Sequence, residues 1–362
     1  MIICEKCFCD VEVISKIRNK GWLGNCSLCN NKNVYVYDTD RDDELTMMFE
    51  ELISIYTPVS LLPKSFPRSE TKLLKKELLN NWRIFNNKTE TEVYRFMVSV
   101  CKDKYCENHE LFDYPVGIVE LYDKEYLSEH SLLTTNSWDD FVDALIRKNR
   151  FHTHFINSDL FRRFCTYIRR SYKVGDTFWR SRISNEDGIP IIDMGAPPFE
   201  KTTNGRANAR GIRCLYLSDS IDTTIYETRA GVYDYLTIGK FRLKKDIIVV
   251  DFKMIDHISP FIEGLDCLEY AINREHLNRI NSEMGRVMRR SDSPLEYVPT
   301  QYITDLIKSF EHDDEAEYSG IEYKSVMYND GYNLAVFEPE LFECIDTVMY
   351  RIDTIDYRKH VI

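Results

Sequence analysis

The sequence predicts an α+β protein in which a small metal-binding segment and a helical region precede a mixed β-sheet. Cysteine pairs are concentrated in residues 1–40, apolar residues recur at helical spacing over residues 41–171, and strand-like segments follow one another over residues 172–362. Segregation of helices and strands along a chain is typical of α+β architecture. We therefore expect a zinc ribbon at 1–40, an α-helical module at 41–171 and a catalytic domain at 172–362.

The overall composition predicts a soluble, cytoplasmic protein. The 362 residues are 43% hydrophobic and 29% charged, as in globular proteins of more than one domain. The net charge of −12 argues against a nucleic-acid or anionic-membrane partner, because such binders usually carry a basic excess. The amino terminus lacks a signal-peptide pattern, and no apolar run approaches the ~18 residues of a membrane span. Eleven cysteines without a secretory signal indicate a reducing compartment.

The first 40 residues contain two CxxC pairs, formed by Cys4, Cys7, Cys26 and Cys29. Four thiolates at this spacing suit tetrahedral Zn²⁺, and a segment this short needs such a structural ion to fold. Cys9 is a further cysteine that could replace Cys7. The alternating segment "NVYVYD" that follows predicts a strand of the ribbon.

Residues 41–171 show helical periodicity and several helix start signals. The segments "DDELTMMFEELISIY" and "TKLLKKELLNNWRIF" each repeat apolar residues on one face, and "PVSLLPKSFP" between them reads as a linker or sharp corner. Thr89 and Glu92 form a capping box, Ser137 precedes a further helical segment, and Asn157 is expected to cap a helix over "SDLFRRFCTYIRRSY", residues 158–172. These apolar stripes predict core packing and not a cofactor site.

One pattern in this region suggests a different activity. Arg147 and His152 have the R-x4-H spacing of HEPN-type ribonucleases, which pair these residues around an RNA phosphate. A chain with many arginines meets that spacing by chance, and the pair can lie beyond the end of its helix. We therefore interpret the pattern as a chance match, with His152 in a solvated loop, and expect no RNA cleavage.

From about residue 172 the segments are strand-like, with helical stretches around 266–290 and at "PTQYITDLIKSF". The strand-like segments are "TFWRSRI", "RCLYLSD", "YLTIGKFRL", "DIIVVDF", "IEYKSVMY" and "YNLAVFEP". Short connections between them predict a largely antiparallel mixed sheet with helices packed on it. The last segment, "LFECIDTVMYRIDTIDY", is expected to complete or cover this sheet. Polar residues stand inside these segments, notably Arg180, Glu227 and Ser325.

Taken together, the ordered pieces "FWR…GRANARGIRCLYLSDSIDTTIYE…PTQYITDLI…GIEYKSV…GYNLAVF" resemble the RES-domain family, over roughly residues 175–340. The front half is similar to the amino-terminal region that some longer RES proteins carry. The resemblance implies a fold like that of mono-ADP-ribosyltransferases and cleavage of the nicotinamide–ribose bond of NAD⁺ by phosphorolysis or hydrolysis. It thereby implies a toxin or defence effector, with NAD⁺, inorganic phosphate and an antitoxin or regulatory protein as partners.

The resemblance also implies the site residues. Arg180, Glu227 and Ser325 match the Arg, Glu and Ser for which the family is named and are expected to be catalytic. The expected binding residues are Arg206 and Asn208 from the "GRWN" motif, together with Tyr216 and Asn333. Here "GRAN" lacks the family's tryptophan, so that wall of the pocket is built differently. Arg182 competes with Arg180, because alternation places both on one strand face.

The chemistry of the reaction assigns roles to these residues. Cleavage leaves oxocarbenium-like charge on the ribose, which the carboxylate of Glu227 would stabilise. Arg180 offers a permanently charged fork to the pyrophosphate, and Gly205 lets Arg206 approach a phosphate. Tyr216 would stack on or orient the nicotinamide, while Ser325 and Asn333 would hold the leaving amide or the ribose.

Two further interpretations keep the fold but change the activity. One is transfer of ADP-ribose to a protein target. The other is a regulatory module whose pocket binds a nucleotide without catalysis while the ribbon contacts a partner. Retention of Arg180, Glu227 and Ser325 together argues against a degenerate pocket.

Overall fold

The protein is described by a computed structural model that covers residues 1–134, 137–286, 293–312 and 315–356. The chain divides into two compact units. The first comprises Met1–Asn136 and His257–Glu275, and the second comprises Ser137–Asp256 and His276–Ile362. Helix α11 (Cys267–Gly285) therefore contributes residues to both units. The division into three folding domains at residues 40 and 171 stays a prediction.

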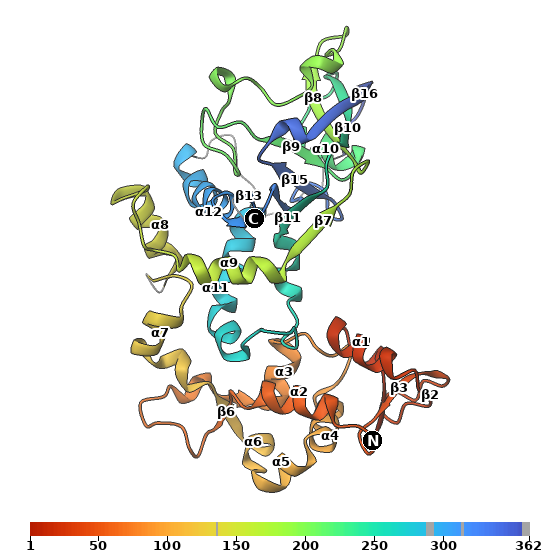
Figure 1. The fold of residues 1–362 in the computed structure, drawn as a ribbon, viewed down its shortest axis with the longest axis vertical. Coiled ribbons are helices and arrows are strands. Elements are labelled where there is room, and N and C mark those ends of the chain that lie inside the picture. Colours follow the sequence, from red (N-terminus) through yellow and green to blue (C-terminus); the bar gives the residue numbers. More distant parts are fainter. Residues whose placement is uncertain (135–136, 287–292, 313–314, 357–362) are drawn as a thin grey trace. The chain divides into compact units, whose positions relative to one another are not determined.

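The first unit combines two small sheets with short helices (Figure 1). Its strands are β1 (Ile2–Cys4), β2 (Leu23–Gly24), β3 (Val34–Asp38), β4 (Thr57–Pro58), β5 (Lys72–Leu73) and β6 (Pro115–Gly117), in the orders β1-β3-β2 and β4-β6-β5. Its helices are α1 (Val11–Lys20), α2 (Glu44–Ile53), α3 (Leu74–Asn80), α4 (Glu90–Val100), α5 (Lys102–Glu107), α6 (Glu110–Asp113) and α7 (Lys124–His130).

A cluster of aromatic rings joins the cysteine-bearing segment to the helices of this unit. Phe8 packs against Phe49 of α2, Phe85 and Phe96 of α4, with ring centroids 5.5–6.5 Å apart. All four side chains are buried. The cysteine segment thus shares its hydrophobic core with the helices, which explains why so short a segment can hold a defined position.

The sequence expectations for this unit are confirmed in part. The capping box of Thr89 and Glu92 begins α4, and the predicted ribbon strand is β3. The helix expected over 71–85 is shorter, because α3 ends at Asn80 and the buried Trp82 lies beyond it. The β4-β6-β5 sheet was not predicted, because its strands of two or three residues are too short to show alternation.

The second unit is built on an eight-stranded sheet with the order β16-β10-β8-β9-β15-β14-β11-β7. The strands are β7 (Arg169–Tyr172), β8 (Thr177–Ser184), β9 (Leu215–Ser218), β10 (Tyr235–Leu243), β11 (Ile247–Asp251), β14 (Gly320–Lys324), β15 (Tyr332–Val336) and β16 (Phe342–Arg351). A hairpin of β12 (Glu311–His312) and β13 (Glu315–Ala316) is separate. The helices are α8 (Trp138–Arg147), α9 (Ser158–Tyr167), α10 (Ile221–Thr228), the second part of α11, and α12 (Val298–Lys308).

This architecture confirms the predicted α+β class with a mixed sheet. The pair β11–β14 is parallel, and the other pairs within the sheet are antiparallel in the part of the chain that is described. Ser137 and Asn157 cap α8 and α9 as expected. One element differs: residues 169–172, read as the end of a helix, form β7, because Ile168 leaves the helical conformation and Asp251 N–H bonds to its carbonyl.

The two faces of the central strands have opposite character. Leu215 and Leu217 of β9 and Leu334 and Val336 of β15 belong to one buried apolar core. Because side chains alternate along a strand, Tyr216 and Ser218 of β9 and Asn333 of β15 face the other side. The sheet thus separates a hydrophobic core from a polar face.

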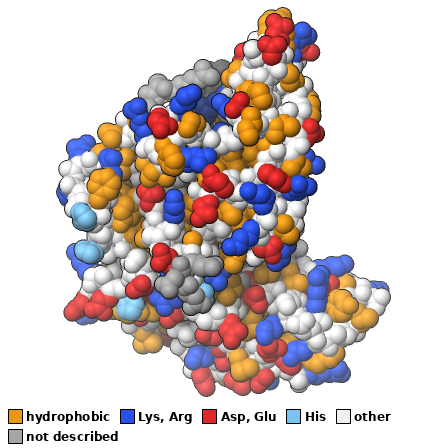
Figure 2. Space-filling model, turned by 45° about the horizontal axis from the view of Figure 1, so that its top comes forward, with side chains coloured by type: hydrophobic (Ala, Val, Ile, Leu, Met, Phe, Trp, Pro, Cys, Tyr) orange, Lys and Arg blue, Asp and Glu red, His pale blue; other side chains and the backbone are white. Residues whose placement is uncertain are grey.

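No helix in the described ranges is both long enough and apolar enough to traverse a bilayer. On the face drawn in Figure 2, acidic and basic side chains of the described residues are interspersed with hydrophobic ones. A surface that binds a polyanion usually carries an excess of basic side chains. This mixed face and the net charge of −12 therefore argue against such a partner.

Leu334 tests the apolar core. We expect Leu334→Ala to lower the free energy of unfolding by about 2–5 kcal/mol, because this fully buried side chain would leave a cavity. Ile192→Ala, at a position that is 89% exposed, is the control and should change it by less than about 0.5 kcal/mol. Urea denaturation followed by circular dichroism measures both; equal effects would contradict the assigned core.

Candidate functional site

The carboxylate of Glu227 is held by two side chains that are distant in sequence. Ser325, which follows β14, donates a hydrogen bond from Oγ to Glu227 Oε1 at 2.6 Å. Asn333 of β15 donates from Nδ2 to the same oxygen at 2.8 Å. The second oxygen, Oε2, receives no donor from the described residues. The arrangement fixes one carboxylate oxygen and leaves the other available to a ligand.

A row of residues across the sheet fixes the amide of Asn333. Ser218 of β9 pairs with Asn333, and Asn333 pairs with Tyr323 of β14. The hydroxyl of Ser218 donates to Asn333 Oδ1 at 2.9 Å. Since the amide oxygen accepts from Ser218, its nitrogen faces Glu227 as a donor. Ser218 therefore orients Asn333, although it does not contact the carboxylate itself.

The turn after β14 orients the hydroxyl of Ser325. Backbone N–H groups of Met327 and Tyr328 donate to Ser325 Oγ at 3.3 and 3.2 Å. With its lone pairs engaged in this way, the hydroxyl hydrogen is directed at Glu227. A Cβ at Gly331, in the same turn, would lie 2.2 Å from Thr223 Oγ1 of α10. Glycine at 331 thus allows the turn to approach the helix that carries Glu227.

The local sequence of α10 explains where Glu227 lies. Ser220 caps the helix by accepting from the N–H of Thr223 at 3.1 Å. Asp219 accepts from the hydroxyl of Thr223 at 2.7 Å and from the N–H of Tyr332 at 3.1 Å. These bonds tie the start of α10 to β15, so that Glu227, in the last turn, lies beside Asn333.

The turn of residues 204–208 is clamped by Tyr216. The Tyr216 hydroxyl donates to Asn208 Oδ1 at 2.7 Å and accepts from the N–H of Ala207 at 3.0 Å. From α12, Gln301 Nε2 donates to the carbonyl oxygens of Gly205 and Asn208 at 2.9 and 2.8 Å. A Cβ at Gly205 would lie 2.4 Å from the Tyr216 oxygen, so the close approach requires glycine.

Arg206 projects from this turn onto the ring of Tyr323. Its guanidinium carbon is 5.1 Å from the ring centroid, and one of its N–H groups donates to the carbonyl of Arg286. Burial raises the pKa of Tyr323, so the ring stays neutral. Because Tyr323 pairs with Asn333 across the sheet, Arg206 brings positive charge to the row of residues next to Glu227.

Arg180 lies where β8 and β9 separate. The two strands share a single bridge, Trp179 with Ser218. Arg180 Nη1 donates to the carbonyl of Tyr216 at 3.0 Å, while its buried Nε has no hydrogen-bond partner in the described part of the chain. Burial lowers the pKa of Arg180 to about 10, which keeps the guanidinium charged at neutral pH. A buried donor without a partner is unusual in proteins and is suited to an anionic ligand.

Arg182 occupies different surroundings. Its Nη1 donates to the carbonyl of Asp193 at 2.7 Å. It lines a cavity of about 880 Å³ formed with the 192–199 loop, Lys201 and Arg213. Arg180 thus bonds to Tyr216 on the polar face, whereas Arg182 bonds to the 192–199 loop. This difference favours Arg180 as the arginine of the Glu227 site.

The structure thus brings together Glu227, Ser325 and Asn333 directly, and Tyr216 with Asn208. Sequence reasoning missed Ser218, Tyr323 and Gln301 as supporting residues. Alternation could have indicated Ser218, since it is two residues from Tyr216 on the same strand face. No sequence signal indicates that Gln301 bonds to the 204–208 turn, because 93 positions separate it from Asn208.

The four predicted metal ligands lie together in the first unit. The sulfur atoms of Cys4, Cys7, Cys26 and Cys29 are all within 4.8 Å of one another. The contacts Cys4–Cys7, Cys4–Cys29 and Cys7–Cys26 measure 3.8, 3.4 and 3.7 Å. Tetrahedral Zn²⁺ with Zn–S bonds of about 2.3 Å separates its sulfurs by about 3.8 Å. The cluster can therefore hold a metal ion of this size.

Two further features support a metal at this cluster. Backbone N–H groups of Leu28 and Cys29 point at the sulfur of Cys26 at 3.4 Å, as they would toward a thiolate. Burial raises the pKa of the Cys4 thiol to about 12, so the thiolates need a compensating cation. Cys9 is outside the cluster, because its thiol donates to the carbonyl of Arg83 at 2.7 Å, and it does not replace Cys7.

Arg147 and His152 do not share a helix face. Arg147 is the last residue of α8 and pairs with Asp143 at 3.0 Å. His152 lies beyond the helix end, where its backbone is bonded to Asn149. This placement fits the loop interpretation of the R-x4-H pattern.

Metal analysis tests the cysteine cluster. We expect the purified protein to contain about one equivalent of zinc, which Cys26→Ser should abolish because three thiolates bind the ion more weakly. Cys9→Ser is the matched control and should retain the metal, since Cys9 lies outside the cluster. Plasma mass spectrometry measures the content, and equal zinc in both variants would argue against the assigned ligands.

Gly205→Ala tests the clamp on the 204–208 turn. The added methyl would collide with the Tyr216 hydroxyl and the Asn208 side chain, so we expect the free energy of unfolding to fall by about 1–3 kcal/mol. Gly195→Ala, where a Cβ meets no atom within 4 Å, should leave it nearly unchanged. Urea denaturation compares the two, and an undisturbed Gly205→Ala protein would refute the clamp.

Comparison with known proteins bears on this arrangement. Residues 177–358 match the RES domain, and they contain the whole hydrogen-bonded network around Glu227. No curated protein and no solved structure matches the chain. The matched segment is half of the 362 residues. The chain therefore belongs to the RES-domain family.

Proposed function

We propose that the second unit cleaves the nicotinamide–ribose bond of NAD⁺, with phosphate or water as the acceptor. The observation that carries the proposal is the Glu227 carboxylate, of which one oxygen is held by Ser325 and Asn333 while the other has no donor among the described residues. A carboxylate that is fixed through one oxygen, beside the polar face of a sheet, is suited to a substrate that develops positive charge. Membership of the RES-domain family supports NAD⁺ as that substrate.

The proposed reaction breaks the bond between C1′ of the ribose and the pyridinium nitrogen. The electron pair of this bond goes to the nitrogen, so nicotinamide leaves neutral and needs no general acid. Positive charge then develops on the ribose, as in glycoside hydrolysis, and Glu227 Oε2 stabilises it or accepts from a ribose hydroxyl. Phosphate or water forms the new C1′–O bond, and a water nucleophile loses its proton to solvent.

Two arginines are the proposed ligands of the pyrophosphate. The buried Nε of Arg180 has no partner among the residues that the structure describes, and Arg206 is held over the Tyr323 ring next to the row that contains Asn333. Guanidinium groups suit phosphate oxygens because they remain charged and offer paired donors. The Tyr216 hydroxyl is engaged in the 204–208 turn, so its proposed role is to orient that turn and the nicotinamide.

Depletion of NAD⁺ by such a reaction would make the protein a toxin or a defence effector in the cytoplasm. The first unit, with structural Zn²⁺ at its four cysteines, is the proposed regulatory part, and an antitoxin or other regulatory protein is the proposed partner. Transfer of ADP-ribose to a protein target is the alternative, because it would use the same bond cleavage with a different acceptor.

Glu227→Ala tests the proposal directly. We expect nicotinamide release from NAD⁺, followed by ¹H NMR, to fall by about 10²–10³-fold, because the charge on the ribose would lose its stabilising carboxylate. Glu227→Gln should be similarly impaired, and Glu186→Ala, an exposed glutamate of the same unit, should retain full activity. Running the assay with and without phosphate identifies the acceptor.

The outcomes separate the candidate activities. ADP-ribose 1″-phosphate as product indicates phosphorolysis and free ADP-ribose indicates hydrolysis. A mass increase on a protein, with release of nicotinamide but without free ADP-ribose or ADP-ribose 1″-phosphate, would instead support transfer to a target. Intact NAD⁺ with the wild-type protein, even after addition of cell lysate, would overturn the proposed activity.

A further inference from the structure

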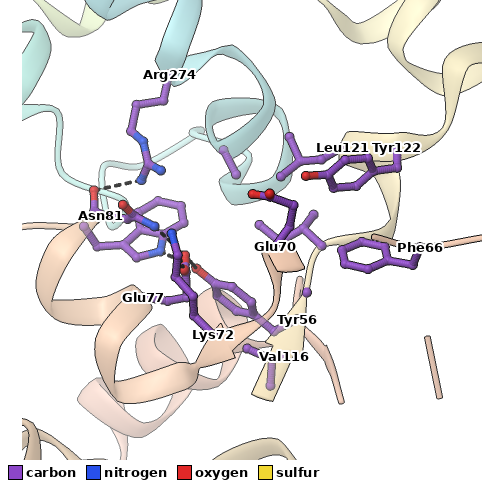
Figure 3. A pocket seen from close by; sticks show the side chains of 14 residues that line it. Tyr56, Phe66, Glu70, Lys72, Glu77, Asn81, Val116, Leu121, Tyr122 and Arg274 are labelled. Carbon is purple, nitrogen blue, oxygen red and sulfur yellow. Dashed lines mark hydrogen bonds and ion pairs between the residues drawn. The ribbon is translucent and has the colours of Figure 1, made fainter. Parts of the chain in front are cut away.

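The first unit contains a small pocket walled by aromatic rings (Figure 3). It encloses about 130 Å³ and lies between the α3 region, the β6 region and the start of α11. The rings that line it belong to Tyr56, Phe66, Trp82 and Tyr122. Phe66 and Tyr122 meet edge to face at 4.8 Å, and Arg274 lies 5.5 Å from the Trp82 ring. An apolar cavity of about 150 Å³ accommodates benzene, so this volume suits a single ring.

One side of the pocket is a rigid polar network that satisfies itself. Trp82 Nε1 donates to the Tyr56 hydroxyl at 2.7 Å, and Glu77 accepts from the Asn81 amide. Lys72 pairs with Glu77 at 3.6 Å. Burial raises the pKa of Tyr56, so its hydroxyl stays protonated. This side supplies shape more than spare hydrogen-bonding capacity.

Arg274 and Glu70 retain unused capacity. Arg274 Nη1 donates to the carbonyl of Asn81 at 2.8 Å, and its other N–H groups have no partner among the described residues. Within the described ranges, the one side-chain contact of the Glu70 carboxylate is a long one, 3.4 Å, from the neighbouring Ser69 hydroxyl. Figure 3 shows the Glu70 carboxylate across the pocket from the Arg274 guanidinium. A donor and an acceptor thus face the same ring-sized space.

We propose that this pocket binds an aromatic carboxamide, with nicotinamide as the ligand. The amide oxygen accepts from Arg274, the amide NH₂ donates to Glu70, and the ring packs among Phe66, Trp82 and Tyr122. An amide both donates and accepts, so it can bond at once to the Arg274 N–H groups that have no partner among the described residues and to the Glu70 carboxylate. The choice of nicotinamide rests on the proposed cleavage of NAD⁺, which would release it, whereas the amide chemistry follows from the pocket itself.

The binding experiment uses the full-length Glu227→Ala protein, titrated with nicotinamide by isothermal calorimetry. Arg274→Met removes the donor and Ala271→Leu fills the space, so each should raise the dissociation constant at least about tenfold. Arg279→Met is the matched control, because Arg279 lies on the same helix outside the pocket and pairs with Glu283. Benzamide should bind like nicotinamide, because it has the same ring size and amide group. Nicotinate should bind at least about tenfold more weakly, because its carboxylate has no hydrogen to donate to Glu70 and is repelled by the Glu70 charge.

Several outcomes decide the proposal independently of the proposed function. Undetectable binding at about 10 mM nicotinamide would overturn it. So would binding that persists in Ala271→Leu but is lost in Tyr216→Phe, which would locate nicotinamide at the Glu227 site. If Ala271→Leu does not fold, Glu70→Met, a change at an exposed position that removes the acceptor, replaces it and should also raise the dissociation constant at least about tenfold. Binding to the pocket in Glu227→Ala, together with a wild-type protein that leaves NAD⁺ intact, would support the pocket and count against the cleavage.

Discussion

The alternation of side chains along β9 and β15 is the constraint on which the site depends. Leu217 and Leu334 face the apolar core, and their neighbours Ser218 and Asn333 therefore face the opposite side. A slip of one residue would exchange the two faces, place Ser218 and Asn333 in the apolar core and turn the leucines toward the polar face. The same packing that stabilises the sheet thus fixes Asn333 toward Glu227.

Close approach between backbone segments is the second requirement of the site. Gly331 lets the turn after β14 meet Thr223, and Gly205 lets the 204–208 turn meet Tyr216. Each contact brings a polar group to a partner that is far away in sequence, such as Ser325 to Glu227. Buried polar groups are tolerable only when paired in this way, so the network both orders the site and constrains it.

The core face of the sheet also carries charged side chains, on β14 and β11. Glu322 of β14 is fully buried and accepts from Arg170 and from the Tyr172 hydroxyl, while Asp251 lies beside Arg170 and Lys253. These groups join β7, β11 and β14 through ion pairs. Removal of one partner would leave an uncompensated buried charge, which is far more costly than the net stability that the pair supplies. This cluster ties β7 and β11 to β14, the strand that Ser325 follows.

The sequence by itself determined the α+β class, the cysteines that form the cluster and most of the elements, because these follow from local signals. CxxC spacing, the Thr89 cap, the alternation in β10 and the ordered RES motifs are each readable within a few residues. Only the tertiary structure decided the rest, because contacts between distant segments leave no local signal. It showed that Cys9 lies outside the cysteine cluster, that residues 169–172 pair as a strand, and that Arg180, and not Arg182, is tied to Tyr216. The orientation of Asn333 by Ser218 and the support of the 204–208 turn by Gln301 likewise depend on register and helix packing.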